Sequence, residues 1–262
     1  MKSATATLHF ELEKLAPAGR VGVIALATDF NIERDLNALY PSDVQSFTSR
    51  VRNYNPLTIE NLRKMEPSIA VCADTILPGT ELDVMIYACT SGTVAIGSER
   101  ITQLIHLSCP KVAVTNPVTA ALAAFSKFQA KRISVLTPYT EVVNQDVAAF
   151  FESQGIEVLS IAGFGFEDDT AMTFISPMDI KHAAIEACDP EADLLFISCT
   201  ALRTSAVIES IEAELDKPVV SSNQVLVWHS LQLMNYPSAI KGFGALLEHY
   251  LETPDNFLRS SL

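Results

Sequence analysis

Short runs of consecutive apolar residues alternate along the chain with longer segments of helical period. Unbroken rather than alternating hydrophobicity is typical of strands that are covered on both faces, as in the parallel sheets of α/β proteins. Two weaker runs, 46–54 and 157–163, contain polar residues and are typical of edge strands. The remaining predicted strands lie at 20–26, 83–89, 111–116, 132–137, 193–199 and 218–223.

Helix boundaries are marked by local signals. A capping side chain followed by proline predicts a helix start, because proline fits the first helical position and the capping oxygen accepts a free backbone N–H. This pattern occurs at Asn55-Pro56, Asn116-Pro117 and Ser176-Pro177. A further helix is predicted from about Thr140, ending at Gly155.

The two halves of the pattern correspond. Strand 20–26 matches 132–137, strand 83–89 matches 193–199, and strand 111–116 matches 218–223, with offsets of 107 to 112 residues. The pattern predicts an α/β protein made of two similar, Rossmann-like halves. Each half has a four-stranded parallel sheet, and pseudo-twofold symmetry relates the two.

This duplication predicts a division of the chain into 1–118, 119–223 and a C-terminal helical segment, 224–262, that packs back on the first half. In open parallel sheets, ligands bind beyond the carboxyl ends of the strands. The active site is therefore expected in the cleft between the halves, lined by residues that follow the strands.

Composition narrows the class of partner. The chain has 262 residues, of which 48% are hydrophobic and 19% charged, so it can bury a sizeable core. Its net charge of −13 argues against nucleic acid or an anionic membrane surface as partner. The apolar runs are too short to cross a bilayer, and no apolar leader is evident. We expect a cytoplasmic protein, and small molecules or other proteins remain as possible partners. We also expect a homo-oligomer, because the segment "VLVWHSLQLM" is apolar enough to pack on its own lobe or on another chain.

The cysteines argue against a disulfide framework. Their number is odd and they form no C-x-x-C pair, which favours free thiols over disulfides or a structural zinc site. Glycine-rich phosphate-binding loops are also missing from the sequence, so a bound dinucleotide or nucleoside triphosphate has no sequence support. The five residues are Cys72, Cys89, Cys109, Cys188 and Cys199.

One sequence motif occurs twice: "DVMIYACTSG" (83–92) is repeated in similar form as "DLLFISCTAL" (193–202), and the two cysteines are 110 positions apart. A thiol at a strand end that is followed at once by a helix is expected to have a lowered pKa. Across a pseudo-twofold axis, Cys89 and Cys199 would then face one pocket and serve opposite faces of a carbanion. Three neighbouring hydroxyls, those of Thr90, Ser91 and Thr200, could bind a carboxylate or enediolate oxygen.

The alternative interpretation is packing, because cysteine is among the most buried residue types. We favour packing for Cys72, Cys109 and Cys188, each of which stands alone. The matched contexts of Cys89 and Cys199 favour function.

The segments "YACTSG", "SCTALR", "TPYTEVVN" (137–144) and "EDDTAM...ISP" (167–177) resemble the aspartate/glutamate racemase superfamily. Within it they are most similar to the branch of maleate cis-trans isomerases, arylmalonate decarboxylases and ectoine-utilisation protein A. The resemblance spans about residues 19–250. It implies a cofactor-independent, metal-free enzyme in which Cys89 and Cys199 are catalytic. It also implies that Tyr139 binds substrate or stabilises an intermediate; alone, Tyr139 would be an ordinary loop aromatic.

The chain departs from that branch at two positions. Maleate isomerases have asparagine where this chain has Asp29 and Asp169. Carboxylates close to a dianion cost about 1 to 4 kcal/mol per contact, depending on the effective dielectric constant. These residues therefore favour a substrate with a cationic or amide nitrogen beside its carboxylate, as in the ectoine-utilisation subgroup. The alternatives are that Asp29 caps a helix beginning near Asn31 and that Asp169 is a solvated loop acid.

Other polar residues are weaker candidates. Arg203 could reach a substrate carboxylate from the first turn of a helix after Cys199, although a surface role fits it better. The histidines lack metal-ligand spacing, and we interpret them as structural or surface residues; they are His106, His182, His229 and His249, with His9 in an N-terminal arm.

The leading hypothesis is an isomerase or racemase that uses two cysteines on a small carboxylate. Maleate cis-trans isomerisation and decarboxylation of the arylmalonate type are the enzymatic alternatives. Decarboxylation is less favoured because the resemblance implies that decarboxylases keep only the second cysteine. A ligand-binding module with two α/β lobes is the alternative outside enzymes, but it leaves the paired thiols unexplained.

Overall fold

The computed structural model describes residues 11–13 and 15–251 and contains two four-stranded sheets, both entirely parallel. The strand orders, β2-β1-β3-β4 and β6-β5-β7-β8, are the same arrangement used twice, which confirms the predicted α/β fold of two similar halves. The first sheet comprises β1 (Gly19–Leu26), β2 (Val44–Val51), β3 (Val84–Ala88) and β4 (Ala113–Thr115). The second comprises β5 (Arg132–Tyr139), β6 (Glu157–Phe166), β7 (Leu194–Ile197) and β8 (Val219–Ser221).

Burial follows the position of each strand. All residues of β3 and β7 are buried, as their unbroken apolar runs predict, whereas β2 and β6 are partly exposed edge strands. β2 begins and ends earlier than the predicted run 46–54, because it pairs with β1 from Gly19↔Val44 to Leu26↔Val51. Beyond Val51 the chain leaves the sheet and turns towards the second half.

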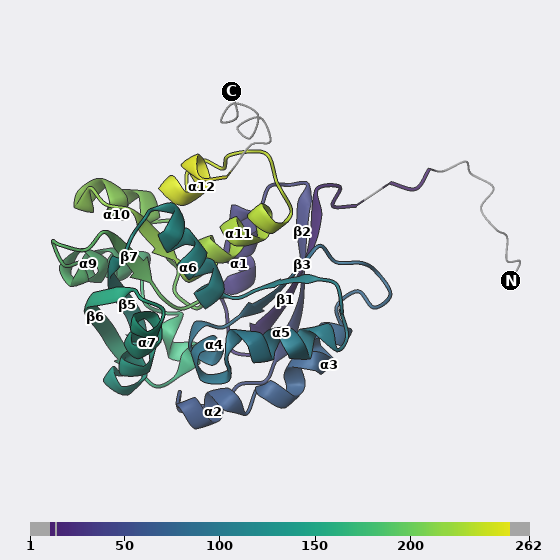
Figure 1. Ribbon diagram of the computed structural model, residues 1–262, viewed down its shortest axis with the longest axis horizontal. Coiled ribbons are helices and arrows are strands. Elements are labelled where there is room, and N and C mark those ends of the chain that lie inside the picture. The colour runs from purple at the N-terminus through teal and green to yellow at the C-terminus, as the bar shows by residue number, and fades with distance from the viewer. Residues whose placement is uncertain (1–10, 14, 252–262) are drawn as a thin grey trace, which may run out of the picture.

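Helices cover the sheets (Figure 1). Those between the strands of the first half are α1 (Ile32–Leu39), α2 (Ile59–Arg63), a 3-10 turn (Glu66–Ser68), α3 (Ile69–Asp74), α4 (Thr90–Ile96) and α5 (Ser98–His106). The next are α6 (Pro117–Lys127), α7 (Glu141–Ser153), α8 (Asp169–Met172), α9 (Pro177–Ala187) and α10 (Ile208–Leu215). The last two are α11 (Ser222–Leu233) and α12 (Ala245–His249).

Three predicted helix boundaries are confirmed and one is wrong. α6 and α9 begin at their prolines with Asn116 and Ser176 as caps, and α7 ends just before Gly155. At Asn55-Pro56, however, no helix starts; the peptide bond is cis, and α2 begins only after Thr58. Long-range contacts prevail over the local signal there, since the Asn55 side chain donates to Asp168 and the backbone N–H of Leu57 donates to the carbonyl of Glu167, both in the second half.

The apolar segment near the C-terminus packs within its own chain. α11 contacts α6, α1 and the strands β3, β4 and β8, and it is buried on almost every side. Trp228 donates its indole N–H to the carbonyl of Tyr250, and Ser230 bonds Tyr40 of the first half. α12 packs against α11, and the side chain of Glu212 on α10 accepts from the backbone N–H of Ala245. The division at residues 118 and 223 stays a prediction, and the first of these positions lies inside α6.

Candidate active site

Residues that follow the strands of both halves meet in one small cavity. From the first half it is lined by Leu26, Thr28, Asp29, Cys89, Thr90 and Ser91, and from the second by Tyr139, Asp169, Cys199, Thr200 and Ala201. Every residue that the sequence predicted for the site is therefore brought to it. Sequence reasoning missed Leu26, Thr28 and Ala201, although the rule that strand-end residues line the cleft points to the first two.

The cavity is closed. The centre of a water molecule can occupy only about 10 Å³ of it, which is roughly the space that a single water requires. Segments of the two halves are joined next to its lining residue Asp169: Asn53 donates to the carboxylate of Asp169, and the backbone N–H of Leu57 donates to the carbonyl of Glu167. A carboxylate substrate of several carbons thus requires its walls to move apart.

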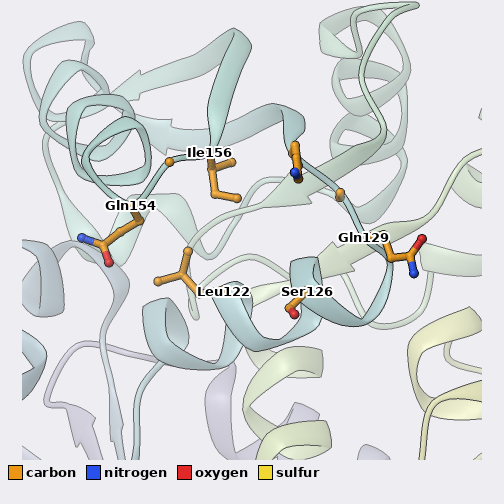
Figure 2. A pocket seen from close by; sticks show the side chains of 8 residues that line it. Leu122, Ser126, Gln129, Gln154 and Ile156 are labelled. Carbon is orange, nitrogen blue, oxygen red and sulfur yellow. The ribbon is translucent and has the colours of Figure 1, made fainter.

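A larger surface hollow, of about 810 Å³, lies elsewhere and contains none of the predicted site residues. Figure 2 shows it between the side chains of Leu122, Ser126 and Gln129 on one side and Gln154 and Ile156 on the other. Its one titratable lining residue is Lys131, so it offers no acid–base pair. The small cavity between the halves is the better candidate on chemical grounds.

Cys89 is held as the sequence predicts. It caps α4, and its sulfur accepts from the backbone N–H of Gly92 at 3.2 Å and lies 3.8 Å from the hydroxyl oxygen of Ser91. Gly92 is required here, because a Cβ at this position would lie 2.8 Å from that sulfur. In the first half, Cys89 thus lies at the end of a strand and is followed immediately by a helix.

Cys199 is held differently, and the prediction that a helix follows it at once is wrong. The backbone at Cys199 has φ 139°, a left-handed conformation that costs a non-glycine residue about 1 to 3 kcal/mol. A turn follows, and α10 begins only at Ile208. The Cys199 N–H donates to the hydroxyl of Ser222 at 2.9 Å, and the nearby Tyr139 hydroxyl and Ala201 N–H act to lower the pKa of the Cys199 thiol.

The predicted lowering of both thiol pKa values is also wrong. Burial, with the neighbouring charge of Asp169, raises the pKa of Cys89 to about 12, although the Gly92 N–H acts in the opposite direction. Burial raises the pKa of Cys199 further still, with Asp169 and Asp29 adding to the effect. Desolvation outweighs the favourable backbone contacts. In the closed cavity, therefore, both sulfurs are thiols at neutral pH.

Asp29 has the capping role that the sequence left open and also lines the cavity. Its Oδ1 accepts from the backbone N–H groups of Asn31 and Ile32 at the start of α1. Its Oδ2 accepts from the hydroxyl of Thr200 in the second half at 2.8 Å. The carboxylate is thus oriented from two sides.

Asp169 is not a solvated loop acid, because it is only 7% exposed. Among the described residues, Asn53 alone donates to its carboxylate, at 2.6 Å. Burial raises the pKa of Asp169 to about 6, and the charges of Asp29 and Asp168 contribute. Asn53, which follows β2, is a further site residue that the sequence analysis did not single out.

Tyr139 connects the two cysteine motifs. It is 2% exposed, and Cys199 and Ser91, one from each motif, are both close enough to influence the pKa of its hydroxyl. Burial raises its pKa, so the phenol stays protonated and can donate. Gly163 on β6 allows this position, since a Cβ there would lie 2.4 Å from the carbonyl oxygen of Tyr139.

The weaker candidates lie outside the cavity. Arg203 is not on a helix; its guanidinium donates to the carbonyl of Ile175. His106 and His229 form hydrogen bonds with Val112 and Thr115, as expected of structural residues. The other sequence candidates outside the cavity are Cys72, Cys109, Cys188, His182 and His249, and His9 lies outside the described residues. Within 11–13 and 15–251, no three His, Cys, Asp or Glu side chains are grouped to hold a metal ion.

We expect Asp169→Asn to change how stability depends on pH. Because the pKa of Asp169 is raised in the folded state from 3.8 to about 6, its contribution is fully present below 3.8 and is lost as pH rises through about 6. Asparagine does not ionise, so from pH 4 to pH 8 the variant should gain about 2 kcal/mol in free energy of unfolding relative to the parent. Urea unfolding across this range measures the difference. Asp74→Asn, an exposed change of equal charge, should show none.

The fold and the paired sulfurs define a class, the two-lobed α/β proteins of the aspartate/glutamate racemase superfamily. A family model described as arylmalonate decarboxylase matches residues 89–247, more than half of the chain. The chain belongs to the arylmalonate decarboxylase family.

Curated and solved relatives agree with this assignment. The chain is 23% identical to a maleate isomerase of Nocardia farcinica, over 87% of this chain and 95% of that protein. A structure of the maleate isomerase from Pseudomonas putida S16 with maleate is similar with a TM-score of 0.81 and 25% identity, over 89% of this chain and 99% of that one. A maleate cis-trans isomerase of Nocardia farcinica, solved with a covalently bound succinylcysteine intermediate, has the same TM-score at 21% identity, over 88% and 98% of the chains. These relatives are enzymes of the same superfamily.

No helix in the described part of the chain is long and apolar enough to cross a membrane.

Proposed function

We propose that the chain is a cofactor-independent isomerase or racemase that acts on a small carboxylate through Cys89 and Cys199. The observation that carries the proposal is that two strand-end sulfurs, one from each half, line the same closed cavity. In racemisation, the thiolate of one cysteine removes a proton from the carbon beside the carboxylate. The thiol of the other then gives its proton to the opposite face, so the two sulfurs exchange protonation states.

We further propose that the substrate has a cationic nitrogen beside its carboxylate. Both cavity aspartates raise the pKa values of Cys89 and Cys199. A cation bound between Asp29 and Asp169 would offset that charge and so favour the thiolate that the reaction needs. The same cation would occupy the side of Asp169 that receives no hydrogen bond from the described residues. Substrate binding would thereby activate sulfurs that are inactive in the closed cavity.

Cis-trans isomerisation of maleate is the second candidate, favoured by the maleate isomerases that match nearly the whole chain. There a thiolate would add to one alkene carbon, the C–C bond would rotate, and expulsion of the sulfur would restore the double bond. Asp169 is the obstacle to a dianion, and it loses its charge below pH about 6. This candidate therefore requires activity towards maleate to increase as pH falls through that value.

Proton exchange in heavy water tests the proposal. The pure protein is incubated with carboxylates with and without an adjacent cationic nitrogen, and recovered ligand is examined for carbon-bound deuterium by mass spectrometry. A racemase, or an isomerase that works by proton transfer, incorporates deuterium into its substrate, and the nitrogen-containing set should exchange faster. Conversion of maleate to its trans isomer without deuterium would identify the thiolate-addition route. Ligands that bind but are recovered unchanged and without deuterium would instead identify a binding module. Loss of carbon dioxide from a malonate would identify a decarboxylase.

Tyr139→Phe should lower turnover by about 10²-fold with little change in KM. The hydroxyl is placed to donate to developing oxyanion charge, which exists mainly in the transition state. Steady-state kinetics measure the effect. Tyr40→Phe is the matched control, because Tyr40 is also buried but bonds Ser230 away from the cavity. Equal kinetics for the two variants would mean that Tyr139 is only a packed aromatic.

A further inference from the structure

One buried hydroxyl joins the two cysteine segments. Ser222 is the first residue of α11, where a capping box fixes the start of the helix, and its side chain is fully buried. Its Oγ accepts from the backbone N–H of Cys199 at 2.9 Å. The same atom lies 2.9 Å from Oγ1 of Thr90, the residue that follows Cys89. α11 thus contacts both cysteine segments through a single oxygen.

The hydrogen bond between Ser222 and Thr90 has a preferred direction. A hydroxyl donates one hydrogen and accepts at most two. One hydrogen lies between the two oxygens, so the other must find an acceptor elsewhere. Among the residues that the structure describes, neither hydroxyl forms a hydrogen bond to any further acceptor, but Thr90 lines the cavity and Ser222 does not. Because a buried donor without an acceptor is costly, Ser222 donates to Thr90, and the hydrogen of Thr90 is left for a water or ligand in the cavity.

The matching threonine of the second motif is committed in the opposite sense. Thr200 holds the place in that motif that Thr90 holds in the first. Its hydroxyl donates to the carboxylate of Asp29 at 2.8 Å, with the carbonyl oxygen of Ala88 at 3.4 Å, so its one hydrogen is used within the protein. The Thr200 side of the cavity therefore presents the acceptor oxygens of Thr200 and Asp29, whereas Thr90 presents a donor.

We propose that Ser222 is a positioning residue that commits the hydroxyl of Thr90 to donate to a carboxylate or oxyanion in the cavity. The substrate then lies with a carboxylate oxygen at Thr90 and its cationic nitrogen at Asp29 and Asp169. This orientation of the substrate rests on the proposed function. The direction of the hydrogen bond from Ser222 to Thr90 does not.

Competition between iodoacetate and iodoacetamide tests the donor role without a known substrate. Both reagents transfer one carbon to a thiolate with loss of iodide, and they differ in carrying a carboxylate or a neutral amide. They are added together, and peptide mass spectrometry gives the ratio of carboxymethyl to carbamidomethyl product at each cysteine. Thiol ionisation and opening of the cavity affect both reactions, so a purely structural role of Ser222 leaves the ratio unchanged. Cys109, which is partly exposed and outside the cavity, is the internal reference.

In Ser222→Ala the ratio at the two cavity cysteines should fall by about three- to tenfold relative to Cys109. The reason is that the Thr90 hydroxyl, without a donor on its oxygen, is no longer fixed in direction and binds the carboxylate of iodoacetate less well.

Ser230→Ala is the matched control for Ser222→Ala. It removes another fully buried hydroxyl from α11, one that bonds Tyr40 and the carbonyl of Val227 away from the cavity. Its ratio should equal that of the parent. A ratio that is also unchanged in Ser222→Ala, or that falls as far in Ser230→Ala, would show that Ser222 only stabilises the start of α11.

Thr90→Val tests the donor that Ser222 directs, and it applies even if Ser222→Ala does not fold. Valine keeps the shape of threonine but lacks the hydroxyl, so the ratio should fall by about tenfold or more, and Thr90→Ser should retain the parent value. An unchanged ratio in Thr90→Val would overturn the donor role. The double variant should match Thr90→Val alone, because the alanine acts through the hydroxyl that the valine removes. Additive losses would mean that Ser222 does not act through Thr90.

This outcome is separable from that of the proposed function. A lower ratio in Ser222→Ala, without turnover of any candidate substrate by the parent, would keep the positioning role and remove the isomerase. Turnover by the parent with an unchanged ratio in Ser222→Ala would do the reverse.

Discussion

Serine in place of Cys89 or Cys199 is expected to lower isomerase or racemase turnover by about 10²- to 10⁴-fold while leaving the fold intact. Serine is nearly isosteric with cysteine, but its hydroxyl is too weak an acid to supply a base. Cys72→Ser is the matched control, because Cys72 is 8% exposed, as Cys199 is, and lies outside the cavity. Steady-state turnover on the substrate found by deuterium exchange gives the measurement.

Loss of one catalytic base does not prevent proton transfer by the other. One of the serine variants should still exchange the substrate's proton with solvent from its own face without completing turnover, which a site with a single base does not predict. Substrate should also slow alkylation of both sulfurs in the parent enzyme. Full turnover in either serine variant would mean that the repeated sequence motif around the cysteines reflects only the duplication of the fold.

The raised thiol pKa values define how this activity should depend on pH. In the free enzyme, burial keeps both sulfurs protonated, and the pKa of Cys89 is about 12. The value of kcat/KM should therefore keep rising with pH above neutrality. If the substrate carries a cation, kcat, which reports the bound state, should level off at a lower pH than kcat/KM does.

The fold was largely predictable because its signals are local. Continuous apolar runs identified β3 and β7, and single side chains at Asn116 and Ser176 capped the helices that their prolines begin. The Asn55-Pro56 signal failed because hydrogen bonds to residues more than 100 positions away determine the backbone there. A local pattern carries no information about such partners.

The sequence predicted which residues form the site, but it did not predict the backbone at Cys199 or the thiol pKa values. The repeated sequence motif placed both cysteines at strand ends, yet it could not show that Cys199 precedes a strained turn rather than a helix. The thiol pKa values depend on how completely the two halves close around the sulfurs, which is a property of the assembled fold. The buried hydrogen bond from the Asn223 side chain to Asp35 was likewise hidden, because 188 positions separate these two residues.

The two cavity aspartates are not equivalent as ligand contacts. The carboxylate of Asp29 is already engaged by two backbone N–H groups and the hydroxyl of Thr200. Within the described residues, Asp169 receives one donor, from Asn53, and so retains more capacity for a substrate. Asp169 should accordingly dominate selectivity, with Asp29 contributing mainly through its charge.

Asp169→Asn is expected to shift selectivity from a zwitterionic substrate towards a dicarboxylate such as maleate by at least about tenfold, measured as the ratio of the two kcat/KM values at pH 8. A tenfold change corresponds to about 1.4 kcal/mol, within the range for one unit charge close to another at the dielectric constants of partly buried sites. Asp29→Asn should act in the same direction but less strongly, because its asparagine Oδ1 can still accept from the start of α1. At pH 5, where Asp169 is largely protonated in the parent, the effect of its substitution should shrink.

Asp74→Asn removes the same charge from an exposed position and should leave the ratio unchanged. A ratio that moves less than about threefold in both cavity variants would mean that neither aspartate contacts substrate, and the case for a nitrogen-containing ligand would fail with it.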